Sequence, residues 1–238
     1  MSKYFKQFTS KNKKFKIKNY SVSQDANHDV RHELAPKIPS RILIIGSSGS
    51  GKTNLLLNMI YNLLPWTKLY VYAKNLSEPK YEQLKNICYI AQKKEKENFA
   101  VFENDEENIV DVDELNPEEH NLIIFDDFLT TIKAQSKIYD LFIRGRKQNA
   151  TVIYLTQSYF DTPKCIRLQC NYLYLFKPCD ERDVSEFYRN HSCGLNKEDF
   201  KNIVHEATSN PKYSFLCIDQ NTDDPKLRLT KNFTHILT

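Results

Sequence analysis

Three of the five glycines in this 238-residue chain lie within nine residues, GSSGSGKTN, which run from Gly46 to Asn54. The stretch fits the pattern G-x-x-x-x-G-K-S/T; the isoleucine-rich run RILII precedes it, and leucines at helical spacing follow it. A strand, a glycine-rich loop and a helix in this order wrap a phosphate chain in backbone N–H groups, which an inward-pointing Cβ would hold away. The stretch therefore predicts a phosphate-binding loop between a buried strand and a helix.

The residues of this loop are expected to bind ATP and Mg²⁺ in distinct ways. Lys52 reaches the β and γ phosphates, and the Thr53 hydroxyl ligates Mg²⁺. The partial positive charge at the start of the following helix adds to the attraction for phosphate. We therefore expect ATP to contact Gly46, Ser47, Ser48, Gly49, Ser50, Gly51, Lys52, Thr53 and Asn54.

Acids end a second apolar run, LIIFDD, and supply the other half of the predicted site. Since the carboxyl ends of parallel strands meet at one edge of a sheet, Asp126 should lie beside the phosphate loop and hold Mg²⁺ through water. Asp127 is expected to orient and deprotonate the attacking water. The run TVIYLTQ places Gln157 at the end of the next strand, where its amide can bond the γ phosphate or that water. The alternative is that these are solvated strand-end residues without a catalytic role.

Arginines near these runs are candidates for stabilising the transferring phosphoryl group, because a guanidinium neutralises its negative charge. Arg144 and Arg146 belong to the segment RGRKQN, between the acid-ended run and the glutamine-ended run, and Arg167 follows further on. The alternative is that they form ion pairs with acids at a helix end.

Runs typical of strands alternate with runs typical of helices along most of the chain. Strands are expected at RILIIG, KLYVYA, NFAVFE, NLIIFDD, TVIYLTQ, YLYLFK and YSFLCID. Helices are expected over residues 52–64, 79–86, 132–143, 180–188 and 197–207. This alternation predicts an α/β fold with a mostly parallel central sheet flanked by helices. Residues 37–238 should form a single domain, preceded by a basic arm or wrap over residues 1–36.

Charge is distributed unevenly along the chain, whose net charge is +4. Seven lysines lie in residues 3–18 and no acid precedes Asp25, whereas residues 103–119 hold nine acids and no basic residue. The basic arm is a candidate for contact with a polyanion, and the alternative is a solvated tail. No apolar run approaches the roughly 18 residues of a membrane-spanning helix, so we expect no membrane insertion. The six cysteines lack metal-site spacing and are expected to be reduced and mostly buried.

The order of RILIIGSSGSGKTNLLLNMI, LIIFDDFL and FIRGRKQNATVIYLTQSYFDTPKCIRLQCNYLYLF resembles the viral genome-packaging ATPases of the FtsK–HerA superfamily. The similarity is strongest to the branch found in poxviruses, giant DNA viruses, virophages and polinton-like elements, and it covers about residues 38–178. The family usually has a histidine where this chain has Lys147, and the wider superfamily often has Asp-Glu where this chain has Asp126-Asp127. The side chain of Asp127 is one methylene shorter than the glutamate of the superfamily, so it reaches less far toward the attacking water.

This resemblance implies a P-loop NTPase of the RecA-like, FtsK–HerA type that uses ATP to pump double-stranded DNA into a preformed capsid. It implies a homo-oligomeric ring, a pentamer or hexamer, in which Arg146 reaches a neighbour's site as a trans-acting finger. The capsid or its portal vertex would be the second partner. The protein would act in the cytoplasm of the infected host cell, in the viral factory, or with the virion.

Two other functions are compatible with a phosphate loop. A small-molecule kinase would transfer the γ phosphoryl group to an acceptor other than water, but Asp127 and Gln157 favour water. A GTP-dependent binding switch usually selects guanine through an N/T-K-x-D loop, which we do not find in this sequence.

Overall fold

One sheet organises the molecule in our computed structural model, which describes residues 5–7, 33–95, 97–128, 131–178 and 180–237. Within these residues the sheet has ten strands in the order β1-β10-β9-β8-β7-β2-β6-β5-β3-β4. The strands are β1 (Phe5–Gln7), β2 (Arg41–Ile45), β3 (Lys68–Ala73), β4 (Ala100–Glu103), β5 (Asn121–Asp126), β6 (Ala150–Thr156), β7 (Tyr172–Leu175), β8 (Leu216–Asp219), β9 (Leu229–Lys231) and β10 (His235–Leu237).

The strands from β7 to β4 are all parallel to one another, which confirms the expected α/β architecture. Parallel strands of such sheets are buried on both faces, and β2 has this character. Leu43 and Ile45 face one hydrophobic core, while Ile42 and Ile44 face the other. The continuous apolar run RILII is therefore explained by two covered faces rather than one.

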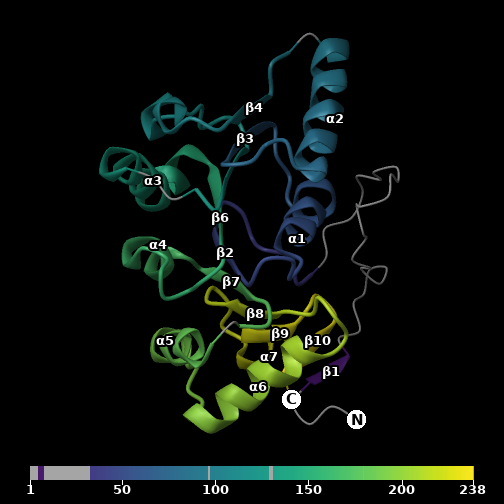
Figure 1. Cartoon of the computed structure of the whole chain (residues 1–238), viewed down its shortest axis with the longest axis vertical. Helices are drawn as coiled ribbons and strands as arrows, with labels where there is room; N and C mark the ends of the chain where they lie inside the picture. Colours follow the sequence, from purple (N-terminus) through teal and green to yellow (C-terminus); the bar gives the residue numbers. More distant parts are fainter. Residues whose placement is uncertain (1–4, 8–32, 96, 129–130, 179, 238) are drawn as a thin grey trace.

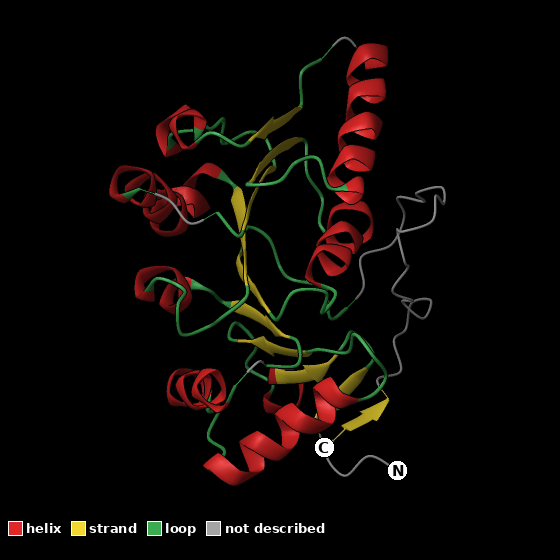
Figure 2. Cartoon of the chain, in the orientation of Figure 1, coloured by secondary structure: helices red, strands yellow, loops and turns green. Residues whose placement is uncertain are grey.

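Helices cover both faces of this sheet, as Figures 1 and 2 show. The helix α1 (Lys52–Asn58) and the helix α2 (Pro79–Glu95) lie on one face, and α3 (Ile132–Arg144), α4 (Lys164–Gln169) and α5 (Glu181–His191) lie on the other (Figure 1). The remaining helices are α6 (Lys197–Ser209), which also packs on the face of α3, and the short α7 (Pro225–Arg228). No helix in the described ranges is both long and apolar enough to cross a membrane.

The other half of the sheet is antiparallel and differs most from the sequence-based expectation. Strands β8, β9, β10 and β1 continue the sheet beyond β7 by antiparallel pairing. Of these we expected only β8, because the others are three residues long and give no periodic signal. Residues 5–7 of the predicted arm form the edge strand β1, and residues 8–32 lie outside the described part of the chain.

Several predicted helices have different ends in the structure. The helix expected over 52–64 begins as α1 and continues as a π-helical turn, Met59–Leu63, before Pro65. The helix expected to end at residue 86 continues to Glu95, because α2 is a polar helix with few buried positions and thus a weak periodic pattern. The short α4 was not expected. The five cysteines in the described residues are free, and three of them are buried.

Candidate functional site

The register of three neighbouring strands brings the predicted site residues to one edge of the sheet. Ile45 at the end of β2 pairs with Thr156 of β6, and Asp126 at the end of β5 pairs with Leu155 of β6. The backbone continues this pattern beyond the strands, since Gly46 N–H donates to Thr156 at 3.2 Å and Asp127 N–H to Leu155 at 3.1 Å. Adjacent strands lie about 4.8 Å apart. The phosphate loop, the acid pair and the glutamine-ended strand therefore converge, as predicted.

The phosphate loop owes its shape to two glycines. A Cβ added to Gly46 would lie 2.6 Å from Ser50 Oγ and 2.7 Å from Phe176 Cβ, closer than such atoms can approach. Gly51, the N-cap of α1, has φ +110°, a backbone conformation that other residues rarely adopt. Lys52 Nζ donates to the carbonyls of Gly46 at 2.6 Å and Ser47 at 3.1 Å, so its ammonium lies against the first residues of the loop.

Asp126 is held by a residue that the sequence did not indicate. The hydroxyl of Tyr81, which is 1% exposed and belongs to α2, donates to Asp126 Oδ2. Burial, together with the nearby Asp126, raises the pKa of Tyr81 well above its ordinary value, so the hydroxyl keeps its proton and remains a donor. Burial also raises the pKa of the Asp126 carboxyl, whereas the hydrogen bond from Tyr81 and the charge of Lys52 act in the opposite direction.

Asp127 and Gln157 form a second contact at the same edge. Gln157 Nε2 donates to Asp127 Oδ2 at 3.1 Å, which joins the end of β6 to the end of β5. Asp127 has φ 48°, in the left-handed region where Asp is one of the few tolerated residues. The two acids are both partly buried but have different partners, Tyr81 for Asp126 and Gln157 for Asp127, so they can serve different roles.

The segment after Gln157 is fixed to α5 by buried and partly buried hydrogen bonds. Asp183 Oδ1 accepts hydrogen bonds from Ser158 Oγ and from Phe160 N–H, both at 2.9 Å. Tyr159 Oη lies 2.8 Å from His191 Nε2, and the other ring nitrogen of that histidine contacts Gln220, the residue after β8. These contacts limit the movement of the chain that carries Gln157.

The three candidate arginines lie in different surroundings. Arg144 forms an ion pair with Asp113. The guanidinium of Arg167 lies 5.1 Å from the centre of the Tyr159 ring and 3.9 Å from the Glu186 carboxylate, and its side chain is 12% exposed. The third arginine, Arg146, is exposed and forms no ion pair with any described residue.

Arg146 does not join the other predicted site residues within one chain. It lies in the 3₁₀ turn Gly145–Gln148, directly before β6, whereas Gln157 directly follows that strand. A strand of seven residues spans about 20 Å at roughly 3.3 Å per residue. Arg146 is therefore at the opposite edge of the sheet from its own phosphate loop.

The residues at the carboxyl edge fit the requirements of Mg²⁺. This ion prefers oxygen ligands and is usually bound through one or two carboxylates, water and substrate phosphates. Asp126 supplies a partly buried carboxylate, and Thr53 supplies a hydroxyl in the first turn of α1, one residue after Lys52. Both groups are hard oxygen donors on elements that the strand register brings together.

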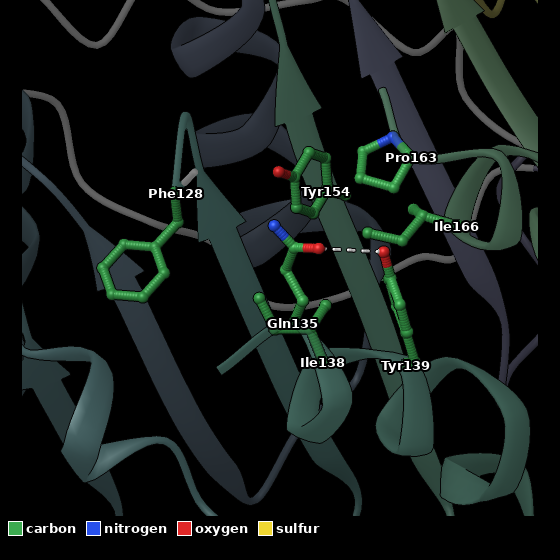
Figure 3. A pocket seen from close by; sticks show the side chains of 7 residues that line it. All are labelled: Phe128, Gln135, Ile138, Tyr139, Tyr154, Pro163 and Ile166. Carbon is green, nitrogen blue, oxygen red and sulfur yellow. Dashed lines mark hydrogen bonds between the residues drawn. The ribbon is translucent and has the colours of Figure 1, made fainter. Parts of the chain in front are cut away.

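A small pocket lies on the face of the sheet that α3 and α4 cover, whereas α1 covers the other face. Its lining includes Phe128, directly after Asp127, together with side chains of α3, β6 and α4 (Figure 3). Gln135 Oε1 accepts a hydrogen bond from Tyr139 at 3.3 Å inside it. The lining is mostly apolar and contains no charged side chain, so the pocket is unsuited to a phosphate chain.

The chain resembles known families and structures over most of its length. A family model described as Poxvirus A32 protein matches residues 26–224. The genome packaging NTPase B204 from Sulfolobus turreted icosahedral virus 2, solved with AMPPCP, is 13% identical, with 81% of this chain and 96% of that chain covered and a TM-score of 0.52. The DNA-packaging ATPase B204 from Sulfolobus turreted icosahedral virus is 16% identical, with 81% of this chain and 96% of that chain covered and a TM-score of 0.53. These structural similarities show a shared fold. No curated protein matches the sequence.

Proposed function

Because the chain belongs to the Poxvirus A32 protein family, we propose that it is an ATP-hydrolysing motor that translocates double-stranded DNA and packages a viral genome into a preformed capsid. One of the two B204 proteins is a genome packaging NTPase that was solved with an ATP analogue, and the other is a DNA-packaging ATPase. Their shared fold supports the transfer of this activity to our chain, which carries its own phosphate loop and acid pair.

The contact between Gln157 and Asp127 is the observation that carries the proposal. In a kinase such a carboxylate would face an acceptor hydroxyl, whereas a carboxylate paired with a strand-end amide is well placed to position and activate water. Here Gln157 Nε2 takes one oxygen of Asp127, and no described side chain donates to the other oxygen. That oxygen can accept a proton from water, which favours hydrolysis.

The proposed chemistry assigns one task to each group at the sheet edge. Lys52 leaves the loop carbonyls and binds the β and γ phosphates. Asp126, held by Tyr81, and Thr53 would hold Mg²⁺, which when bound neutralises charge on the phosphates. Asp127 accepts a proton from the attacking water. At the same time the oxygen of that water bonds to the γ phosphorus, and the bond between the γ phosphorus and the bridging oxygen breaks, so that the bridging oxygen stays with the β phosphate. Gln157 orients that water, and its amide loses a hydrogen bond to the γ phosphate when this phosphate departs.

We propose that several copies form a ring, a pentamer or hexamer, around DNA, and that Arg146 completes the site of a neighbour. Its exposure, its lack of a described partner and its distance from its own phosphate loop support a role in trans rather than in cis. Arg144 and Arg167 are poorer candidates because each already faces an acidic side chain.

Double-stranded DNA and the capsid or its portal vertex are the proposed partners, and the cytoplasm of the infected cell is the proposed site of action. The lysines in residues 3–18 could contribute to DNA binding through phosphate contacts. Such contacts would make affinity fall steeply with salt, so deletion of residues 1–18 should flatten the salt dependence.

The proposal is tested by phosphate release from ATP with and without long double-stranded DNA, together with a mass measurement in nucleotide. We expect DNA to stimulate turnover and the mass to correspond to a closed ring. The Lys52→Ala variant is the control for contaminating ATPases. Turnover that DNA leaves unchanged, or transfer of the phosphoryl group to a small acceptor, would contradict the proposal.

A further inference from the structure

An exposed aromatic side chain lies directly against the phosphate loop. Tyr213, in the loop between α6 and β8, is 55% exposed. A Cβ added to Gly51 would lie 3.4 Å from both Cβ and Cδ1 of this tyrosine. The other exposed large apolar side chains of the described residues belong to α2, α3 and α4. Packing of the hydrophobic core therefore does not explain why the Tyr213 side chain lies beside the phosphate loop.

Strand pairing brings Tyr213 to the loop from 162 residues away in sequence (213 − 51). Leu216 at the start of β8 pairs with Leu175 at the end of β7, and Phe176 N–H then donates to Ile45 at 2.9 Å. The start of β8 thus lies at the same edge as the end of β2, where the phosphate loop begins.

The backbone around Tyr213 is held firmly in an unusual conformation. Its φ of 72° is in the left-handed region, which is rare for an aromatic residue and typical of sites where the surroundings impose strain. Ser214 N–H donates to Pro211 at 3.1 Å, and Phe215 N–H donates to Asn232 Oδ1 at 3.1 Å. The backbone that carries the exposed ring is consequently held in place, although the ring contributes little to the core.

We propose that Tyr213 is the stacking platform for the purine base of the bound nucleotide, an inference that rests on the proposed function. The phosphates occupy the loop that ends at Gly51, so the nucleoside must extend from the loop past its rim, where the tyrosine ring lies. A π face binds any base, and a purine offers more stacking surface than a pyrimidine.

The Lys212 side chain lies over one face of the Tyr213 ring. Its ammonium lies 4.9 Å from the centre of the Tyr213 ring, and both residues are exposed. A cation–π contact at an exposed site is weaker than stacking of a base on an aromatic ring. The flexible lysine can therefore move aside when a nucleotide binds.

Calorimetry with three ligands tests this inference: AMPPCP, its guanine counterpart and inorganic tripolyphosphate, each with Mg²⁺. The variants are Tyr213→Leu, which keeps a bulky side chain on the same backbone but removes the π face, and Tyr213→Phe, which keeps the ring. We expect Tyr213→Leu to weaken both nucleotides by about 5- to 100-fold, as base stacking requires. It should leave the affinity for tripolyphosphate unchanged, and Tyr213→Phe should behave like the wild type.

Two results would overturn the inference. If Tyr213→Leu weakens tripolyphosphate as much as it weakens AMPPCP, the ring only supports the phosphate loop. If it weakens neither ligand, the base lies elsewhere. A failure of the proposed function would be distinct, because it would appear as ATP turnover that DNA leaves unchanged and not as a change in the affinities of Tyr213→Leu.

Discussion

Mild acid should destabilise the protein through His191, a buried residue that contacts the segment following Gln157. The ring is 6% exposed at the end of α5, and it contacts Tyr159 and Gln220. Burial, and to a lesser extent the positive charge of Arg167, lowers the pKa of His191 from 6.5 to about 4. The folded protein therefore holds this imidazole neutral at pH values where the unfolded chain binds a proton.

The sign and size of the effect follow from this difference. Above pH 6.5 both states are neutral at His191 and stability is not reduced. Below pH 6.5 the unfolded state binds more protons than the folded state. The free energy of unfolding therefore decreases as the pH is lowered from 6.5 to about 4, where the folded state also takes up a proton. A shift of this size corresponds to a loss of about 2 kcal/mol at pH 5, since each pH unit contributes at most about 1.4 kcal/mol.

Urea unfolding at pH 7.5 and pH 5.0 measures this loss, and the His191→Gln variant isolates it. Glutamine retains groups that can bond to Tyr159 and Gln220 but does not titrate. The carboxylates contribute equally to both proteins, so the wild type should lose about 2 kcal/mol more than the variant between the two pH values. If the two proteins lose the same amount, His191 is not held neutral and our account of this network is wrong.

Three substitutions test the roles assigned at the sheet edge. Asp127→Asn should retain ATP but hydrolyse it at least about 100-fold more slowly, and near-normal turnover would exclude it as the base. Tyr81→Phe removes the hydrogen bond that the Asp126 carboxylate accepts, so it should raise the Mg²⁺ concentration needed for tight ATP binding by about tenfold. Nucleotide binding without Mg²⁺ should be unchanged. If the variant and the wild type show the same Mg²⁺ dependence, Tyr81 does not position Asp126. Arg146→Ala should bind ATP but turn it over poorly, and mixing with Lys52→Ala should restore activity; mixtures that assemble but stay inactive would exclude a finger in trans.

The parts of the site that the sequence predicts are those with strong local patterns. The phosphate loop follows from fixed glycine and lysine spacing, and Asp126 follows from an apolar strand that ends in an acid. The resemblance to viral packaging ATPases rests on the same segments, and the family match confirms it. The parallel half of the sheet was predictable because its strands are continuous apolar runs.

Residues supplied by distant elements could not be predicted in this way. Tyr81 reaches Asp126 only because α2 packs over the sheet, and its sequence signal was no more than a tyrosine within a predicted polar helix. Tyr213 approaches Gly51 through antiparallel pairing of short strands, which leave no periodic pattern. Arg146 was assigned from family resemblance, and its place at the far edge of the sheet is visible only in the fold.

The central claim, that ATP hydrolysis at this site drives movement along double-stranded DNA, is tested most directly by displacement of a third strand. A triplex-forming oligonucleotide is bound at one end of a long duplex, and its release is followed after addition of the protein and ATP. We predict release that requires ATP, lags in proportion to the distance travelled, and is absent with AMPPCP or with Asp127→Asn. Vigorous ATP hydrolysis without release of the third strand at any duplex length would contradict the claim.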